Sequence, residues 1–137
     1  MSDPFVDTDV LVRLISGDDP VKHAAADALF RRVATGQMTV AAPESVIADT
    51  IYVLSSPRLY AMSRGRVRET LAPLLALPAF RVRNRTEVLR ALDLYATTRL
   101  DFSDALLVAA MEQEGSVDLY SYDRHFDRVA GITRREP

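Results

Sequence analysis

The chain has 137 residues, of which 48% are hydrophobic and 26% are charged, a balance that predicts one folded domain covering residues 1–137. It has no cysteine, which excludes disulfide scaffolds, thiolate zinc sites and cysteine nucleophiles. Its net charge is −2, yet residues 58–90 carry eight arginines against two acids, a local charge of +6. With no signal-like start and no apolar run near the ~20 residues that cross a bilayer, we expect a cytoplasmic protein with no membrane partner.

The hydrophobic pattern predicts short strands that alternate with helices. In chain order we expect a strand at 4–6, a helix from about 10 to 15, a helix at 21–35, a strand at 38–42, helices at 43–55 and 61–77, a strand at 79–83, helices at 86–97 and 103–114, and a strand at 117–120. Strands separated by helices of this length favour a parallel sheet in an α/β sandwich.

Acidic residues stand where the predicted strands end. Asp7 and Asp9 follow the first strand, and Asp123 follows the last one. In open parallel sheets ligands bind beyond the carboxyl ends of the strands, so these positions favour a functional site. Each of these residues could instead have a purely structural role, since Asp caps helices and begins turns.

Asp104 is predicted to share a helical face with apolar side chains, among them Val108 and Met111. An unpaired carboxylate on such a face is costly, so Asp104 is expected to be paired, protonated or bound to a cation. The alternative is that Asp101 caps this helix and Asp104 interacts with its dipole. Asp49 and Glu44 border the apolar stripe of the helix at 43–55, and Asp49 is the stronger candidate for a functional acid.

Together these acids suggest a metal site. With only two histidines and no cysteine in the chain, carboxylates at strand ends and helix starts favour Mg²⁺ or Mn²⁺ over zinc. Such ions activate water and neutralise phosphate oxygens during hydrolysis of a phosphodiester. The four candidate catalytic and metal-binding residues are Asp7, Asp49, Asp104 and Asp123.

Four segments in this order resemble the PIN-domain proteins, and especially the VapC-type toxins of bacterial toxin–antitoxin pairs. They are residues 5–11 (Phe-Val-Asp-Thr-Asp-Val-Leu), 46–54, 101–107 (Asp-Phe-Ser-Asp-Ala-Leu-Leu) and 121–126 (Ser-Tyr-Asp-Arg-His-Phe). The resemblance implies a three-layer α/β/α sandwich with a mainly parallel central sheet. It also implies a Mg²⁺- or Mn²⁺-dependent endoribonuclease, a homodimer, and a cognate antitoxin that covers the acidic site.

Carried over by position, the resemblance assigns the four family acids to Asp7, Asp49, Asp104 and Asp123, with Thr8, Asp9, Ser121 and Asp101 in supporting places. The chain departs from the family pattern twice. The second acid is usually Glu, and Asp49 is one methylene shorter, which weakens the expected metal contact. The residue two after the first acid is often Asn, whereas Asp9 adds negative charge.

Two other functions fit parts of the sequence. A haloacid-dehalogenase-type phosphatase would use an Asp-x-Asp pair such as Asp7 and Asp9, but it also needs a downstream lysine, and Lys22 is the only lysine in the chain. A PIN fold kept as a catalytically weak binding module is the non-enzymatic alternative. Cleavage of RNA that a chelator abolishes would distinguish the nuclease from both.

The arginine-rich stretch is either an ordinary solvated surface or an RNA-binding one. Guanidinium groups bind phosphate through two parallel hydrogen bonds, and a nuclease with an acidic centre needs basic residues for affinity. Residues that share one side of an extended segment or one helical face are the candidates for contact with the RNA backbone. These are Arg64, Arg68, Arg81, Arg83 and Arg85.

Overall fold

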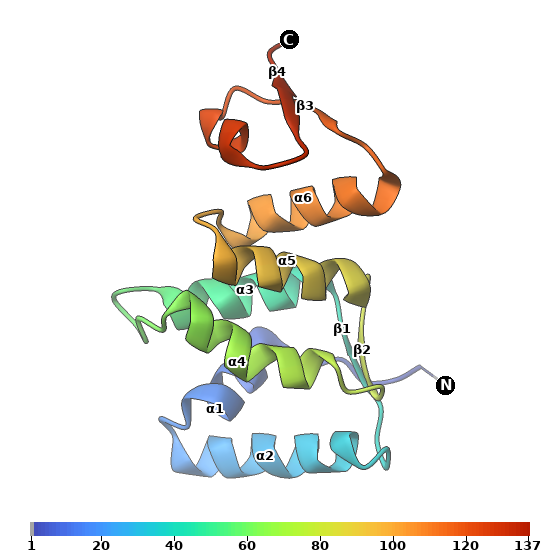
Figure 1. The fold of residues 1–137 in the computed structure, drawn as a ribbon. Helices are drawn as coiled ribbons and strands as arrows, with labels where there is room; N and C mark the ends of the chain where they lie inside the picture. The colour runs from blue at the N-terminus through green and yellow to red at the C-terminus, as the bar shows by residue number, and fades with distance from the viewer. Residues whose placement is uncertain (1) are drawn as a thin grey trace.

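Two pairs of parallel strands organise the chain in the computed structural model, which describes residues 2–137 (Figure 1). β1 (Val40–Ala42) pairs with β2 (Phe80–Val82), and Phe5 adds a single parallel bridge to Ala41. β3 (Asp118–Tyr120) pairs with β4 (Thr133–Arg135) in a separate sheet. The expected α/β class with parallel strands is confirmed, and the strands are divided between two small sheets.

Helices make up most of the chain between these strands. They are α1 (Thr8–Ser16), α2 (Pro20–Ala34), α3 (Glu44–Ser55), α4 (Arg64–Leu75), α5 (Arg85–Thr97), α6 (Phe102–Glu114) and the short 3₁₀ helix η1 (Arg124–Arg128). Every helix expected from the sequence is present, whereas η1 and β4 were not expected and the strand at 4–6 is reduced to one bridge. Within residues 2–137 we find no helix with the length and apolar character needed to cross a membrane.

Local capping explains why several helices begin and end where they do. The Asp19 carboxylate accepts a hydrogen bond from the Lys22 N–H at the start of α2, and the Ser63 hydroxyl accepts one from the Arg66 N–H at the start of α4. At the other end of α1, Gly17 adopts the left-handed conformation with φ of 65°, which glycine reaches without steric cost. These short-range contacts are readable from the sequence.

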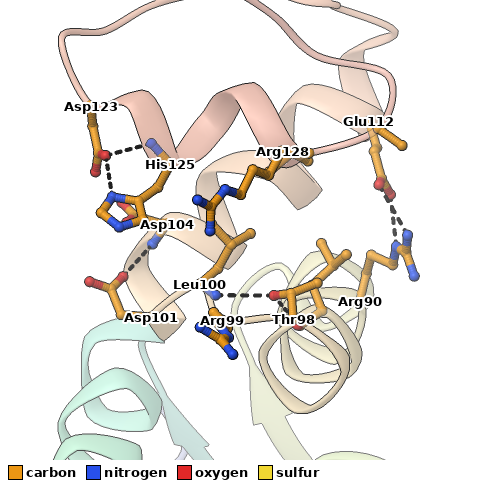
Figure 2. A pocket seen from close by; sticks show the side chains of 13 residues that line it. Arg90, Thr98, Arg99, Leu100, Asp101, Asp104, Glu112, Asp123, His125 and Arg128 are labelled. Carbon is orange, nitrogen blue, oxygen red and sulfur yellow. Dashed lines mark hydrogen bonds and ion pairs between the residues drawn. The ribbon is translucent and has the colours of Figure 1, made fainter.

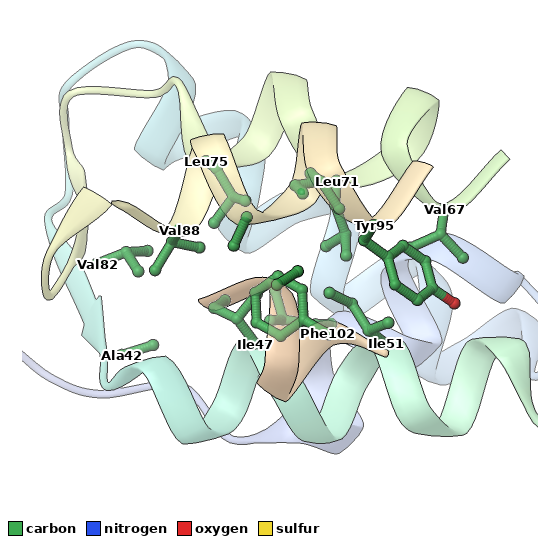
Figure 3. Packing of buried hydrophobic residues seen from close by; sticks show 14 of the residues in the cluster. Ala42, Ile47, Ile51, Val67, Leu71, Leu75, Val82, Val88, Tyr95 and Phe102 are labelled. Atoms are coloured by element: carbon green, nitrogen blue, oxygen red, sulfur yellow. The ribbon is translucent and has the colours of Figure 1, made fainter. Parts of the chain in front are cut away.

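The hydrophobic core lies where α3, α4, α5 and α6 meet beside the first sheet (Figure 3). Ile47 and Ile51 of α3 face Leu71 of α4, and Phe102 enters from the start of α6. All four side chains are almost completely buried. Since a buried aliphatic or aromatic side chain stabilises a fold by roughly 1.5–3 kcal/mol, this cluster holds the helices together.

One arginine joins α4 to the connection between α5 and α6. The Arg64 guanidinium donates to the backbone carbonyl of Tyr95 at 2.9 Å and to that of Leu100, and lies 4.3 Å from the centre of the Tyr95 ring. The last carbonyls of a helix have no partner inside it and carry its negative dipole end, so a cation is favourable there. Arg64 therefore has a structural role that the sequence did not reveal.

We predict that Arg64→Ala lowers the free energy of unfolding by roughly 1–3 kcal/mol, because buried carbonyls lose a charged donor. Chemical denaturation measured by circular dichroism tests this. Arg66→Ala is the matched control, since among residues 2–137 the Arg66 side chain makes only an exposed pair with Glu69 at 3.5 Å, and such pairs contribute little. Equal stability of the two variants would contradict the assigned role of Arg64.

Candidate functional site

A cavity of about 800 Å³ lies between the end of α5, the start of α6 and η1 (Figure 2). Its walls combine acidic, basic and imidazole side chains over an apolar floor that includes Leu94 and Leu100. The ionisable residues are Arg90, Arg99, Asp101, Asp104, Glu112, Asp123, His125 and Arg128. Three of the acids singled out from the sequence therefore share one cavity.

Asp101 and Asp104 occupy the first turn of α6. The Asp101 carboxylate accepts a hydrogen bond from the Asp104 N–H at 2.8 Å, so Asp101 caps the helix as the sequence suggested. Asp104 itself is half-buried and accepts no hydrogen bond from another residue among those described. Its carboxylate is thus available to a ligand.

Asp123 begins η1 and is held by its neighbours. Its carboxylate accepts hydrogen bonds from the His125 backbone N–H at 2.9 Å and from the His125 ring Nδ1 at 2.7 Å. Its own N–H donates to the Ser121 hydroxyl at 3.0 Å, so Ser121 helps to fix the turn that begins η1. The hydrogen bonds from His125 lower the pKa of Asp123, so this acid is ionised at neutral pH.

The pKa values of Asp104 and Asp123 are shifted in opposite directions. Partial burial raises the pKa of Asp104, and the negative charges of Asp101 and Asp123 raise it further, while His125 acts in the other direction. Like charges brought together around a partly desolvated carboxylate are typical of a site that binds a cation or transfers a proton. Asp104 is therefore the acid of this cavity whose pKa is raised.

Two arginines reach the same cavity without a partner. Within residues 2–137, the guanidinium groups of Arg99 and Arg128 make no hydrogen bond or ion pair, whereas Arg90 is paired with Glu112 at 2.8 and 3.1 Å (Figure 2). Neither arginine was among the candidate residues predicted from the sequence. Arg99 stands two residues before the Asp101 cap and Arg128 stands three after His125, and this closeness to the acidic motifs was the signal that could have pointed to them.

A comparison with protein-family models gives a match to the PIN domain over residues 5–132. The chain belongs to the PIN domain family. PIN domains are generally metal-dependent nucleases, which agrees with a cavity lined by acids and free arginines. No curated protein matches this chain in a sequence comparison.

The remaining acids of the PIN motif lie outside the cavity. Asp7 caps α1 by accepting a hydrogen bond from the Thr8 N–H at 2.7 Å. Asp9 faces a separate hollow beside Arg13, and Asp49 is exposed on α3. Neither Asp7 nor Asp49 contributes to the pKa shift of Asp104.

The acids of the PIN motif carry the donor atoms that a metal ion would need. Carboxylate oxygens are the ligands that Mg²⁺ and Mn²⁺ prefer. Across residues 2–137, however, no three histidine, aspartate or glutamate side chains gather into a group that could bind a metal. The donors have the chemistry that these ions prefer, and the described residues hold them in separate places, Asp104 and Asp123 at the cavity, Asp7 before α1 and Asp49 on α3.

The five arginines predicted to contact RNA also lie away from the cavity. Arg64 and Arg85 donate to backbone carbonyls, of Leu100 and Phe80 among others. Arg81 pairs with Asp3 at 2.6 Å, and Arg68 lies 3.9 Å from Asp93. Arg83 is exposed beside Arg81 in a different hollow. Their contact with RNA stays a prediction.

We predict that Asp104→Asn leaves the melting temperature at pH 7 unchanged or raises it. The folded-state pKa of Asp104 lies above its unfolded value, so the ionised carboxylate costs stability once the pH exceeds the folded pKa, and the amide avoids that cost. The difference should disappear below pH 3, where the acid is protonated in both states. Thermal unfolding of both proteins across this pH range measures the effect.

Asp101→Ala is the contrasting variant, because it removes a helix cap and should lower the free energy of unfolding by about 1 kcal/mol. A lower melting temperature for Asp104→Asn at pH 7 would assign Asp104 a structural role.

Proposed function

We propose that this PIN domain is a Mg²⁺- or Mn²⁺-dependent endoribonuclease, a hydrolase of RNA phosphodiester bonds that acts in the cytoplasm as the toxin of a toxin–antitoxin pair. The observation that carries the proposal is the cavity in which Asp104 and Asp123 lie beside Arg99 and Arg128, two arginines whose guanidinium groups have no partner in residues 2–137. The match to the PIN family over residues 5–132 supports a nuclease rather than the phosphatase alternative.

In this proposal the basic residues hold the substrate. Arg99 and Arg128 have no competing partner among the described residues, so each can donate to the non-bridging oxygens of an RNA phosphate. Their charge also offsets the repulsion between the phosphate and the acids. His125 holds Asp123 in place through two hydrogen bonds and keeps it ionised.

The acids provide the catalytic centre. We propose Asp7, Asp49, Asp104 and Asp123 as the catalytic and metal-binding residues, with Thr8, Asp9, Ser121 and Asp101 supporting them. For the second acid we propose Asp49 rather than Glu44, because the Glu44 carboxylate accepts a hydrogen bond from the Asn84 side chain, whereas the Asp49 carboxylate accepts none among the described residues and is exposed.

We predict that the purified protein cleaves RNA with Mg²⁺ or Mn²⁺ and that a chelator stops the reaction. Asp104→Asn should lower the cleavage rate roughly 100-fold or more, because the cavity loses a half-buried carboxylate that can bind the metal ion or transfer a proton. Cleavage of labelled RNA measures both effects, with circular dichroism as the control for folding. A well-folded protein that binds RNA without cutting it would support the alternative of a catalytically weak binding module.

We also predict that Arg99→Ala and Arg128→Ala each weaken RNA binding about 10-fold, the loss of one charge-assisted contact. Each change should reduce the dependence of log K on log salt by roughly one ion. Titration of labelled RNA at several salt concentrations tests this. Arg124→Ala is the matched control, because Arg124 also lies on η1 but does not line the cavity. An equal loss in the control would assign the effect to overall charge.

The proposed partner is an antitoxin that covers the same cavity. The exposed carboxylates of Asp101 and Asp123 are suited to a basic side chain from a partner protein, which would exclude RNA. Growth arrest on expression of the chain, relieved by Asp104→Asn and by the neighbouring gene, would support the toxin role. A nuclease that leaves growth unaffected would point to a housekeeping function.

A further inference from the structure

The candidate cavity is longer than a metal ion and one phosphate require. It extends along α6 from Asp104, in the first turn, to Glu112, in the last turn. These two residues lie roughly two helical turns apart, about 12 Å along the axis of α6. Figure 2 shows Asp104 and Asp123 at one end, Glu112 at the other, and Arg128 between them. The end at Glu112 is therefore left without a role by the chemistry of the acids.

Arg90 of α5 and Glu112 of α6 form this end of the cavity. The Arg90 Nε donates to Glu112 Oε2 at 2.8 Å, and Arg90 Nη2 donates to Oε1 at 3.1 Å. These hydrogen bonds lower the pKa of Glu112, so its carboxylate is charged at neutral pH. The two side chains are 49% and 46% exposed, and a pair of this kind contributes little to stability. Its effect is to hold the guanidinium in one orientation beside the cavity.

The pair leaves one edge of the Arg90 guanidinium free. A guanidinium carries five N–H groups in a planar fork, and Glu112 takes the two on the Nε side. The edge formed by Nη1 and Nη2 keeps one parallel N–H on each nitrogen, and within residues 2–137 Nη1 makes no hydrogen bond. Arg90 can therefore donate two parallel hydrogen bonds to a ligand that has two adjacent acceptors.

Among the RNA bases, guanine has such a pair of acceptors. Its O6 and N7 accept two hydrogen bonds from one arginine, whereas adenine has an amino donor beside N7. On the same edge uracil has a single acceptor and cytosine has a donor. In an RNA duplex these edges lie in a deep groove that side chains do not reach, so the matching guanine is in a single-stranded segment.

The floor of the cavity suits the flat face of a base. Leu94 lies one turn beyond Arg90 on the same face of α5, and Leu100 lies in the connection from α5 to α6. Val129, which follows η1, adds to the apolar lining. An apolar surface with a few polar groups in fixed positions is typical of sites that bind small molecules or parts of larger ones.

We propose that this cavity binds a guanine of a single-stranded RNA, with Arg90 donating to its O6 and N7 and Glu112 holding Arg90 in place. The base lies on the apolar floor, and its phosphate lies at Arg128, toward the acids. Arg90 selects the base, and Glu112 is its positioning residue. The inference rests on the proposed function, because that function makes RNA the substrate, and it predicts cleavage close to a guanosine.

Binding of short labelled RNAs tests the proposal. The probe is an oligouridine with one central guanosine, and the protein is Asp104→Asn, with which the RNA is expected to stay intact. We expect this RNA to bind about 10-fold more tightly than plain oligouridine, the discrimination of one bidentate contact. Inosine keeps O6 and N7 and should bind as guanosine does, whereas adenosine and 7-deazaguanosine should bind like uridine. Fluorescence anisotropy measures the affinities.

Two further substitutions, each added to Asp104→Asn, separate base selection from general charge. Arg90→Lys keeps the charge but loses the planar fork, so the preference for guanosine should disappear. Glu112→Ala removes a negative charge and the support of Arg90, so oligouridine should bind more tightly while the preference falls. Arg31→Lys is the matched control and should keep the preference, because Arg31 pairs with Asp27 at 2.7 Å on α2 and does not line the cavity.

Equal affinity for the guanosine and adenosine RNAs would overturn the proposal, as would a guanosine preference that survives Arg90→Lys. Free GMP that competes as well as the guanosine RNA would overturn the assignment to RNA in favour of a mononucleotide. Cleavage by the wild type decides the proposed function separately. A protein that prefers guanosine RNA but does not cleave it supports the guanine site and contradicts the nuclease, whereas cleavage without base preference does the reverse.

Discussion

The guanidinium of Arg64 fixes the geometry on which the candidate site depends. It reaches from the start of α4 to the carbonyls that end α5 and begin the connection to α6, and it stacks over Tyr95 on the way. Leu100 is one residue before Asp101, so this contact holds the backbone next to the residue that caps α6. The acids of the first turn of α6 are therefore positioned by a residue that touches neither of them.

Electrostatics in the cavity follow from that placement. One carboxylate oxygen of Asp101 caps α6, which places the charge of Asp101 close to Asp104. Asp123, at the start of η1, lines the same cavity. Hydrogen bonds from His125 stabilise Asp123 as an anion, whereas partial burial and then the charges of Asp101 and Asp123 raise the pKa of Asp104. Arg99, from the connection between α5 and α6, and Arg128, from η1, also line the cavity, which therefore combines an excess of negative charge with cations that can bind phosphate.

Structure that depends on residues close together in the sequence could be predicted, whereas contacts between residues far apart in the sequence could not. The helices, the capping by Asp101 and the candidate role of Asp104 follow from short spacings and periodicity. The role of Arg64 depends on carbonyls more than thirty residues away, so no local pattern distinguishes it from a solvated arginine. The division of the strands into two sheets likewise depends on which edges meet, because strands of three residues carry little register information.

The ion pairs of the C-terminal segment have a consequence for cooperativity. Asp118 pairs with Arg135 and Asp127 pairs with Arg134, so these ion pairs join residues of this segment to one another and not to the helices. The segment meets the helices chiefly through Phe126. A unit of this kind opens at a lower free energy than the core, so its backbone amides exchange with solvent while α3 and α5 stay folded. Exchange at the β3 amides then reports on the opening of this segment rather than on global unfolding.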